Sequence, residues 1–102
     1  MKINKLIQQG ESETLEFKQS FEKDTIVSLV AMANTRGGAV LIGVTNKGEI
    51  KGVQLGRETL QQWVNDITQA TDPKLIPYFR SKTINGKVVV EIRVKEHSIK
   101  PI

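Results

Sequence analysis

Fourteen consecutive residues, 31–44, constrain the fold of this chain more than any other segment. A helix-like apolar pattern ends there, two glycines follow, and a nearly continuous apolar run begins at once. Glycine adopts the positive φ that a helix exit often needs, and a short apolar run is typical of a central strand. The segment therefore predicts a helix, a sharp turn and a buried strand in direct succession. We expect Asn34, Gly37 and Gly38 to form the turn.

The helix before this turn is expected over residues 24–34, with Asp24 as its N-cap. Apolar residues surround most of it, because Val27 and Ala31 add to the main apolar stripe. The pattern predicts a largely buried helix.

Local patterns also predict two more helices and five strands. The helices span 3–9 and 57–70, and the strands span 12–18, 39–44, 49–53, 76–84 and 87–95. Asn85-Gly86 separates the last two strands and is a strong hairpin signal. In the last strand, alternation turns Val89, Glu91, Arg93 and Lys95 outward. This order predicts an α+β fold: a two-layer sandwich with a mixed sheet, two main helices on one face and a short N-terminal helix.

The distribution of charge points to a polyanionic partner. The formal net charge of the 102 residues is +4, but residues 73–102 hold seven basic and two acidic side chains. A basic end on a near-neutral body is typical of a nucleic-acid-binding surface. The chain has no cysteine, one histidine and no membrane-length apolar segment, which argues against disulfides, thiol catalysis and a membrane span. We expect a cytoplasmic protein.

Short motifs are spread over nearly the whole chain. They are Glu11, Leu15-Glu16-Phe17-Lys18, Ala33-Asn34-Thr35-Arg36-Gly37-Gly38, Ile42-Gly43-Val44, Gly48-Glu49-Ile50-Lys51-Gly52-Val53, Gly86-Lys87-Val88-Val89-Val90 and Lys100-Pro101. In order and spacing they resemble the Schlafen AlbA-type domain family. The resemblance implies an Alba-like fold for residues 1–102, a single domain acting as the N-terminal module of a longer transcriptional regulator. It also implies binding of nucleic acid, DNA rather than RNA, and allows a homodimer.

Five basic side chains are the expected contacts to nucleic-acid phosphates. They are Lys18, Arg36, Arg80, Lys82 and Lys87. Tyr78 would share a strand face with Arg80 and Lys82, where it could stack on an unpaired base. We expect these cations to form one continuous surface.

A metal-dependent RNA endonuclease is the first alternative. Glu11 and Glu16 match two glutamates that certain Schlafen proteins use to hold a divalent cation, whereas the third carboxylate is missing because Thr45 and Asn46 occupy its place. Without that activity we expect no cofactor and no metal. The second alternative is a dimerisation module that pairs through a sheet edge and binds no nucleic acid.

Overall fold

The computed structural model describes residues 1–98, 100 and 101. Its elements are α1 (Ile3–Gln9), β1 (Leu15–Lys18), α2 (Lys23–Ala33), β2 (Gly37–Ile42), α3 (Thr59–Ala70), β3 (Tyr78–Ile84) and β4 (Lys87–Lys95). Both ends of most elements fall within three residues of the predicted positions. No helix formed by the described residues has the length and apolar character needed to cross a bilayer.

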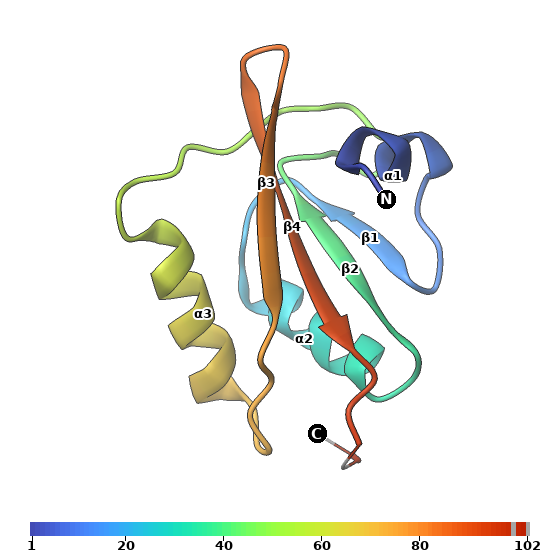
Figure 1. The fold of residues 1–102 in the computed structure, drawn as a ribbon, viewed down its shortest axis with the longest axis vertical. Helices are drawn as coiled ribbons and strands as arrows, with labels where there is room; N and C mark the ends of the chain where they lie inside the picture. Colours follow the sequence, from blue (N-terminus) through green and yellow to red (C-terminus); the bar gives the residue numbers. More distant parts are fainter. Residues whose placement is uncertain (99, 102) are drawn as a thin grey trace.

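The strands form one mixed sheet with the order β1-β2-β4-β3 (Figure 1). β1 pairs with β2 in parallel, and β4 pairs with both β2 and β3 in antiparallel fashion. Asn85 and Gly86 both have positive φ and join β3 to β4 directly, as the hairpin signal predicted. The fold is α+β, as expected.

Helices α2 and α3 cover one face of the sheet. Buried residues of both helices pack there against alternate residues of β2 and β4, among them Leu29, Ile67, Val40 and Ile92. Phe21, just before α2, stacks on Trp63 of α3 with ring centroids 4.9 Å apart. This stack links the two helices over the sheet.

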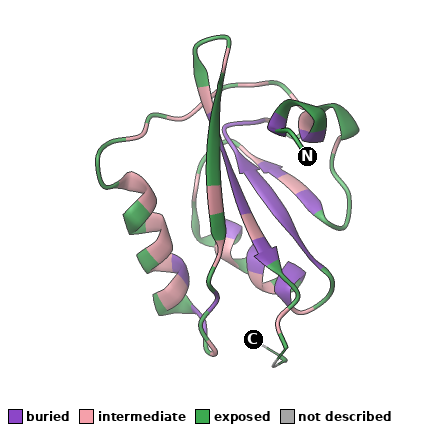
Figure 2. Cartoon of the chain, in the orientation of Figure 1, coloured by how far each residue is buried: buried purple, intermediate pink, exposed green. Residues whose placement is uncertain are grey.

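The short helix α1 covers part of the opposite face. Its Ile3 and Leu6 pack with Phe17, Leu41 and Val89 in a second core cluster. The sheet therefore has apolar cores on both faces, and its inner strands are buried along most of their length (Figure 2). α1 is too short to cover the β3–β4 hairpin, whose strand β3 is largely exposed.

The prediction that Val89 and Glu91 point into solvent was wrong. Both are buried, Val89 completely and Glu91 with 1% of its surface exposed. They do lie on the face away from α2 and α3, as the alternation indicated, but α1 and the neighbouring side chains cover that face. The burial thus depends on a helix 80 residues away in sequence.

Two predictions about α2 were also wrong. The helix starts one residue earlier than expected, with Glu22 as its N-cap, and the Glu22 amide donates to Thr25 Oγ1 at 3.1 Å. Asp24 lies in the first turn instead and is engaged with Lys18. Val27 and Ala31 are exposed, so the helix is not largely buried.

The segment after β2 forms single bridges in place of the predicted strand 49–53. Val44 bridges to Ile50, and Val53 bridges to Val88. Gly43 has a φ of 102°, which turns the chain out of the ladder, so β2 ends at Ile42, two residues before the predicted end.

Candidate nucleic-acid interface

The hairpin of β3 and β4 places most of its charged side chains on the same side of the sheet as α1, in the part of that side that α1 does not cover. Tyr78 pairs with Arg93, Arg80 with Glu91, and Lys82 with Val89. Paired residues of antiparallel strands project from the same face, so these side chains share one surface with Lys87 and Lys95. We call this surface, formed by Tyr78, Arg80, Lys82, Lys87, Arg93 and Lys95, the hairpin face.

Glu91 lies buried at the centre of the hairpin face. Arg80 Nε donates to one of its carboxylate oxygens at 2.5 Å, and Arg93 Nε donates to the other at 2.7 Å. The side chains of both arginines remain about half exposed, at 50% and 43%. One buried negative charge therefore holds two guanidinium groups, and the group as a whole keeps a net charge of +1.

The three lysines of the hairpin face add uncompensated positive charge. Within the part of the chain that the structure describes, no carboxylate lies within ion-pair distance of Lys82, Lys87 or Lys95. Lys87 Nζ donates only to the Ile50 carbonyl, at 3.4 Å. Lys95 Nζ lies 5.3 Å from the ring centre of Tyr78, in a cation–π contact.

A groove of about 580 Å³ runs between the hairpin face and α1. Its lining includes Leu6 of α1, Leu15 of β1, and Tyr78, Arg80, Glu91 and Arg93 of the hairpin. Arg80 also donates to the carbonyl of Met1, which ties the start of the chain to one side of the groove. The groove thus combines guanidinium groups with apolar and aromatic walls.

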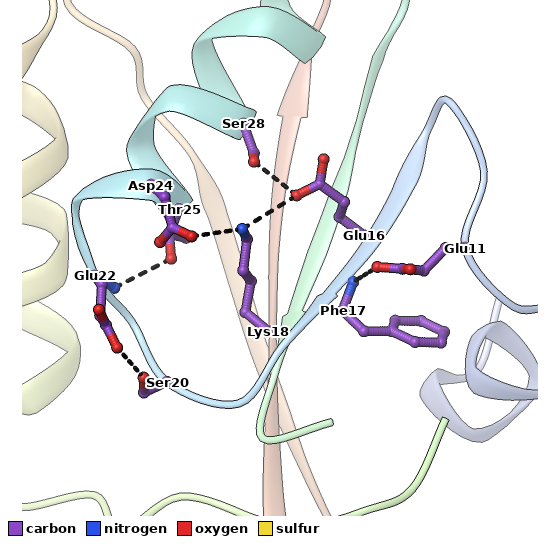
Figure 3. A network of polar contacts seen from close by, with 9 residues as sticks. All are labelled: Glu11, Glu16, Phe17, Lys18, Ser20, Glu22, Asp24, Thr25 and Ser28. Carbon is purple, nitrogen blue, oxygen red and sulfur yellow. Dashed lines mark hydrogen bonds and ion pairs between the residues drawn. The ribbon is translucent and has the colours of Figure 1, made fainter. Parts of the chain in front are cut away.

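Lys18 and Arg36, the other two expected contacts, lie outside the hairpin face. Lys18 is half-buried against the start of α2, where it pairs with Asp24 at 2.8 Å and with Glu16 at 3.6 Å (Figure 3). The hydrogen bond to Asp24 raises the pKa of Lys18 and lowers that of Asp24. Arg36 pairs with Glu13. Acidic neighbours thus offset both charges, and the five expected cations do not form one surface.

Glu11 and Glu16, the carboxylates of the nuclease alternative, are each engaged separately. Glu11 accepts a hydrogen bond from the Phe17 amide at 2.9 Å, at the outer edge of β1. Glu16 points toward α2, where Ser28 Oγ donates to it at 2.6 Å (Figure 3). Among the described residues, no three acidic, histidine or cysteine side chains gather in a way that could hold a metal ion. The two glutamates instead order β1 and its contact with α2.

The glycines of the predicted turn are held by close backbone contacts. Gly37 has a φ of 80°, and a Cβ atom there would lie 2.7 Å from the Val94 carbonyl oxygen. A Cβ atom on Gly38 would lie 2.7 Å from the Thr14 carbonyl oxygen. Asn34 is the C-cap of α2, and its amide donates to the Val30 carbonyl. The turn itself spans residues 34–36, and Gly37 and Gly38 are the first two residues of β2 rather than part of the turn. Their lack of a side chain lets β2 lie close to both neighbouring segments.

Comparison with known protein families identifies the chain. The profile described as Schlafen, AlbA_2 matches residues 11–102, which is most of its length. The chain belongs to the Schlafen AlbA_2 family. No curated protein matches it significantly.

Two solved structures share the fold of this AlbA_2 domain. The DIP2311 protein from Corynebacterium diphtheriae has a TM-score of 0.67 and 18% identity, over 97% of this chain and 22% of that one. The second is the N-terminal domain of an ATP-dependent DNA helicase RecG-related protein from Nitrosomonas europaea. It has a TM-score of 0.61 and 21% identity, over 94% of this chain and 74% of that one. This chain thus spans about a fifth of the first protein.

Alternation placed Arg93, Lys95 and Glu91 on one face of the last strand, but they were not among the contacts expected for this AlbA_2 domain. A further signal for their part in the hairpin face was present. A two-residue turn at Asn85-Gly86 fixes the register of the hairpin, which places Arg93 beside Tyr78. Alternation then assigns Lys95 to the same face.

Proposed function

We propose that this AlbA_2 domain binds nucleic acid through the phosphate backbone, with the hairpin face as its contact surface. The contacts are Arg80, Lys82 and Lys87, as the sequence suggested, together with Arg93 and Lys95. Lys18 and Arg36 are not part of this surface, because their charges are offset by acidic neighbours.

One observation carries the proposal: five basic side chains share a face with a single acidic one, and that acid is buried beneath two of them. Each lysine or arginine that reaches a phosphate releases condensed counterions, which favours binding without reading the base sequence. The two basic side chains of the edge strand β3, Arg80 and Lys82, could also serve only to keep the sheet from aggregating. That role would not require Arg93, which lies on the inner strand β4.

The finer part of the proposal is that the ligand is DNA and that the domain is one module of a longer regulator. The RecG-related protein supports DNA, because its description names a DNA helicase. The DIP2311 protein supports a module, because the matching region is 22% of its chain. Nothing in the geometry of Glu11 and Glu16 favours the nuclease alternative.

The dimer alternative meets an electrostatic obstacle at the exposed edge of β3. Antiparallel pairing of two copies around Ser81 would place Arg80 of one copy opposite Lys82 of the other. Like charges directly opposite one another destabilise a strand pair. The edge is therefore better suited to a polyanion than to a second copy.

The experiment is a salt-dependent binding titration of a fluorescently labelled DNA oligonucleotide by anisotropy. Lys82→Gln/Lys95→Gln removes two exposed charges and leaves the Glu91 ion pairs intact. We expect weaker binding at low salt and a shallower slope of log K against log salt, by about 0.7–0.9 for each lysine that contacts a phosphate. Circular dichroism checks that the variant is folded.

The matched control is Lys23→Gln/Arg57→Gln, which removes the same charge near α2 and α3, on the other side of the sheet. Its slope should equal that of the unmodified domain. Equal losses in both variants would show that net charge alone attracts DNA, and the hairpin face would lose its assigned role.

A further inference from the structure

The groove beside α1 differs from the rest of the hairpin face in being concave and partly apolar. Its volume of about 580 Å³ lies within the range of pockets that bind small organic groups. Arg80 and Arg93 line the groove together with Tyr78 and Leu6. A charged group and a flat apolar group could be held side by side.

We propose that this groove takes one phosphate and the adjoining unpaired base of a nucleic-acid strand, so that the domain prefers single-stranded to double-stranded nucleic acid. This inference rests on the proposed function and names the form of ligand that the same surface selects.

The phosphate half of the subsite is built on Glu91. One guanidinium group is enough to neutralise the Glu91 carboxylate. Here two guanidinium groups, those of Arg80 and Arg93, bind it, each through its Nε atom, so one positive charge is left over. Arg93 donates to no other group among the described residues, so its terminal nitrogens remain for a ligand. Because the buried carboxylate already fixes both guanidinium groups, little conformational freedom is lost when a phosphate binds.

The base half of the subsite is Tyr78. Its side chain is 55% exposed although aromatic residues are usually covered, and in the strand register it lies directly beside Arg93. Lys95 lies over the ring and restricts its orientation. Bases inside a duplex are stacked on each other and present only their edges, so the ring can stack only on a base that is unpaired.

The test compares a labelled 12-nucleotide single strand with the same strand annealed to its complement, both by anisotropy at one low salt concentration. We expect the single strand to bind more tightly. Tyr78→Leu should weaken single-strand binding by about fivefold or more, the range expected for one lost base stack, and should leave duplex binding unchanged. Tyr78→Phe keeps the ring and should bind as the unmodified domain does.

A second measurement needs no substitution at the site. Tyr78 is the only tyrosine of the chain, so its ring-proton NMR signals are unambiguous. Stacking on a base should move them upfield with the single strand and not with the duplex. Two results would overturn the inference: ring signals that do not move, or equal affinities for the single strand and the duplex together with no effect of Tyr78→Leu on either affinity. In both cases, binding that still depended on the lysines would leave the proposed function standing. Absence of binding to either ligand would overturn both.

Discussion

Arg93 donates its Nε–H group to the buried carboxylate of Glu91 at 2.7 Å, from two residues further along the same face of β4. An acidic side chain this deeply buried is unfavourable unless it is paired and hydrogen-bonded. Here both of its oxygens accept from arginines that remain half exposed. The ion pairs of Glu91 therefore have two effects: they make the burial of its carboxylate tolerable, and they hold two arginines at the surface of the sheet.

Glu91→Gln should destabilise the domain. The amide retains the shape of the side chain but replaces one acceptor oxygen with a donor that faces a guanidinium group. We expect a loss of about 1–3 kcal/mol in the free energy of unfolding, the range for a charge-assisted hydrogen bond, measured by urea denaturation. Glu49→Gln, at an exposed position where the carboxylate pairs with Lys51 on the surface, is the matched control and should change stability by less than about 1 kcal/mol. Equal stability of the two variants would argue against this structural role of Glu91.

Gly37→Ala should be among the most damaging glycine substitutions. Gly37 and Gly10 both have a φ of 80°, but a Cβ atom at Gly37 meets the Val94 carbonyl at 2.7 Å, whereas one at Gly10 meets nothing within 4 Å. A φ of 80° strains the backbone of alanine at both sites. Overpacking should add roughly 1 kcal/mol or more at Gly37. Denaturation of the two variants side by side isolates this steric part, and equal losses would contradict it.

Acid should weaken the contact between Lys18 and Asp24. The hydrogen bond from Lys18 lowers the pKa of Asp24 below its ordinary value of 3.8. A carboxylate with a lowered pKa stabilises the fold above its unfolded-state pKa, and this contribution is lost as the pH falls through the folded-state value. Asp24→Asn should therefore be less stable than the unmodified domain at pH 7, and the difference should shrink as the pH falls below 3.8 and through the lowered folded-state pKa of Asp24.

The measurement is urea denaturation at several pH values between 2 and 7. Asp72→Asn, at an exposed position outside the helices, removes the same charge and is the control. At the alkaline end the sign reverses. The pKa of Lys18 is raised above 10.5, so its contribution is complete below that value and is lost as the pH rises through the folded-state pKa. A stability difference for Asp24→Asn that did not shrink as the pH fell below 3.8 would contradict the account.

Elements were predictable where the signal is local. The apolar run of β2, the end of α2 before it and the Asn85-Gly86 turn each determine their own backbone, and the structure contains all three, with Gly37 and Gly38 taken into β2. The burial of Glu91 was not predictable from β4 alone, because it depends on where α1 packs and on the arginines beside it. The N-cap at Glu22 was missed because Asp24 is the more usual capping residue in that stretch.

The site was only partly predictable for a similar reason. Arg80 and Lys82 follow from strand alternation, which needs no knowledge of the rest of the chain. Lys18 and Arg36 meet their acidic partners only once the fold is formed, and the partner of Arg36, Glu13, lies 23 residues away. Alternation can assign a cation to a face, but it cannot show whether a neighbouring acid offsets its charge.

The most direct test of the hairpin face is amide chemical-shift mapping of the isotope-labelled domain during titration with a short DNA strand. The account predicts that the largest shifts fall on residues 78–82 and 91–95, with α3 unchanged. Shifts concentrated on α2 and α3, or absent at saturating DNA and low salt, would contradict it.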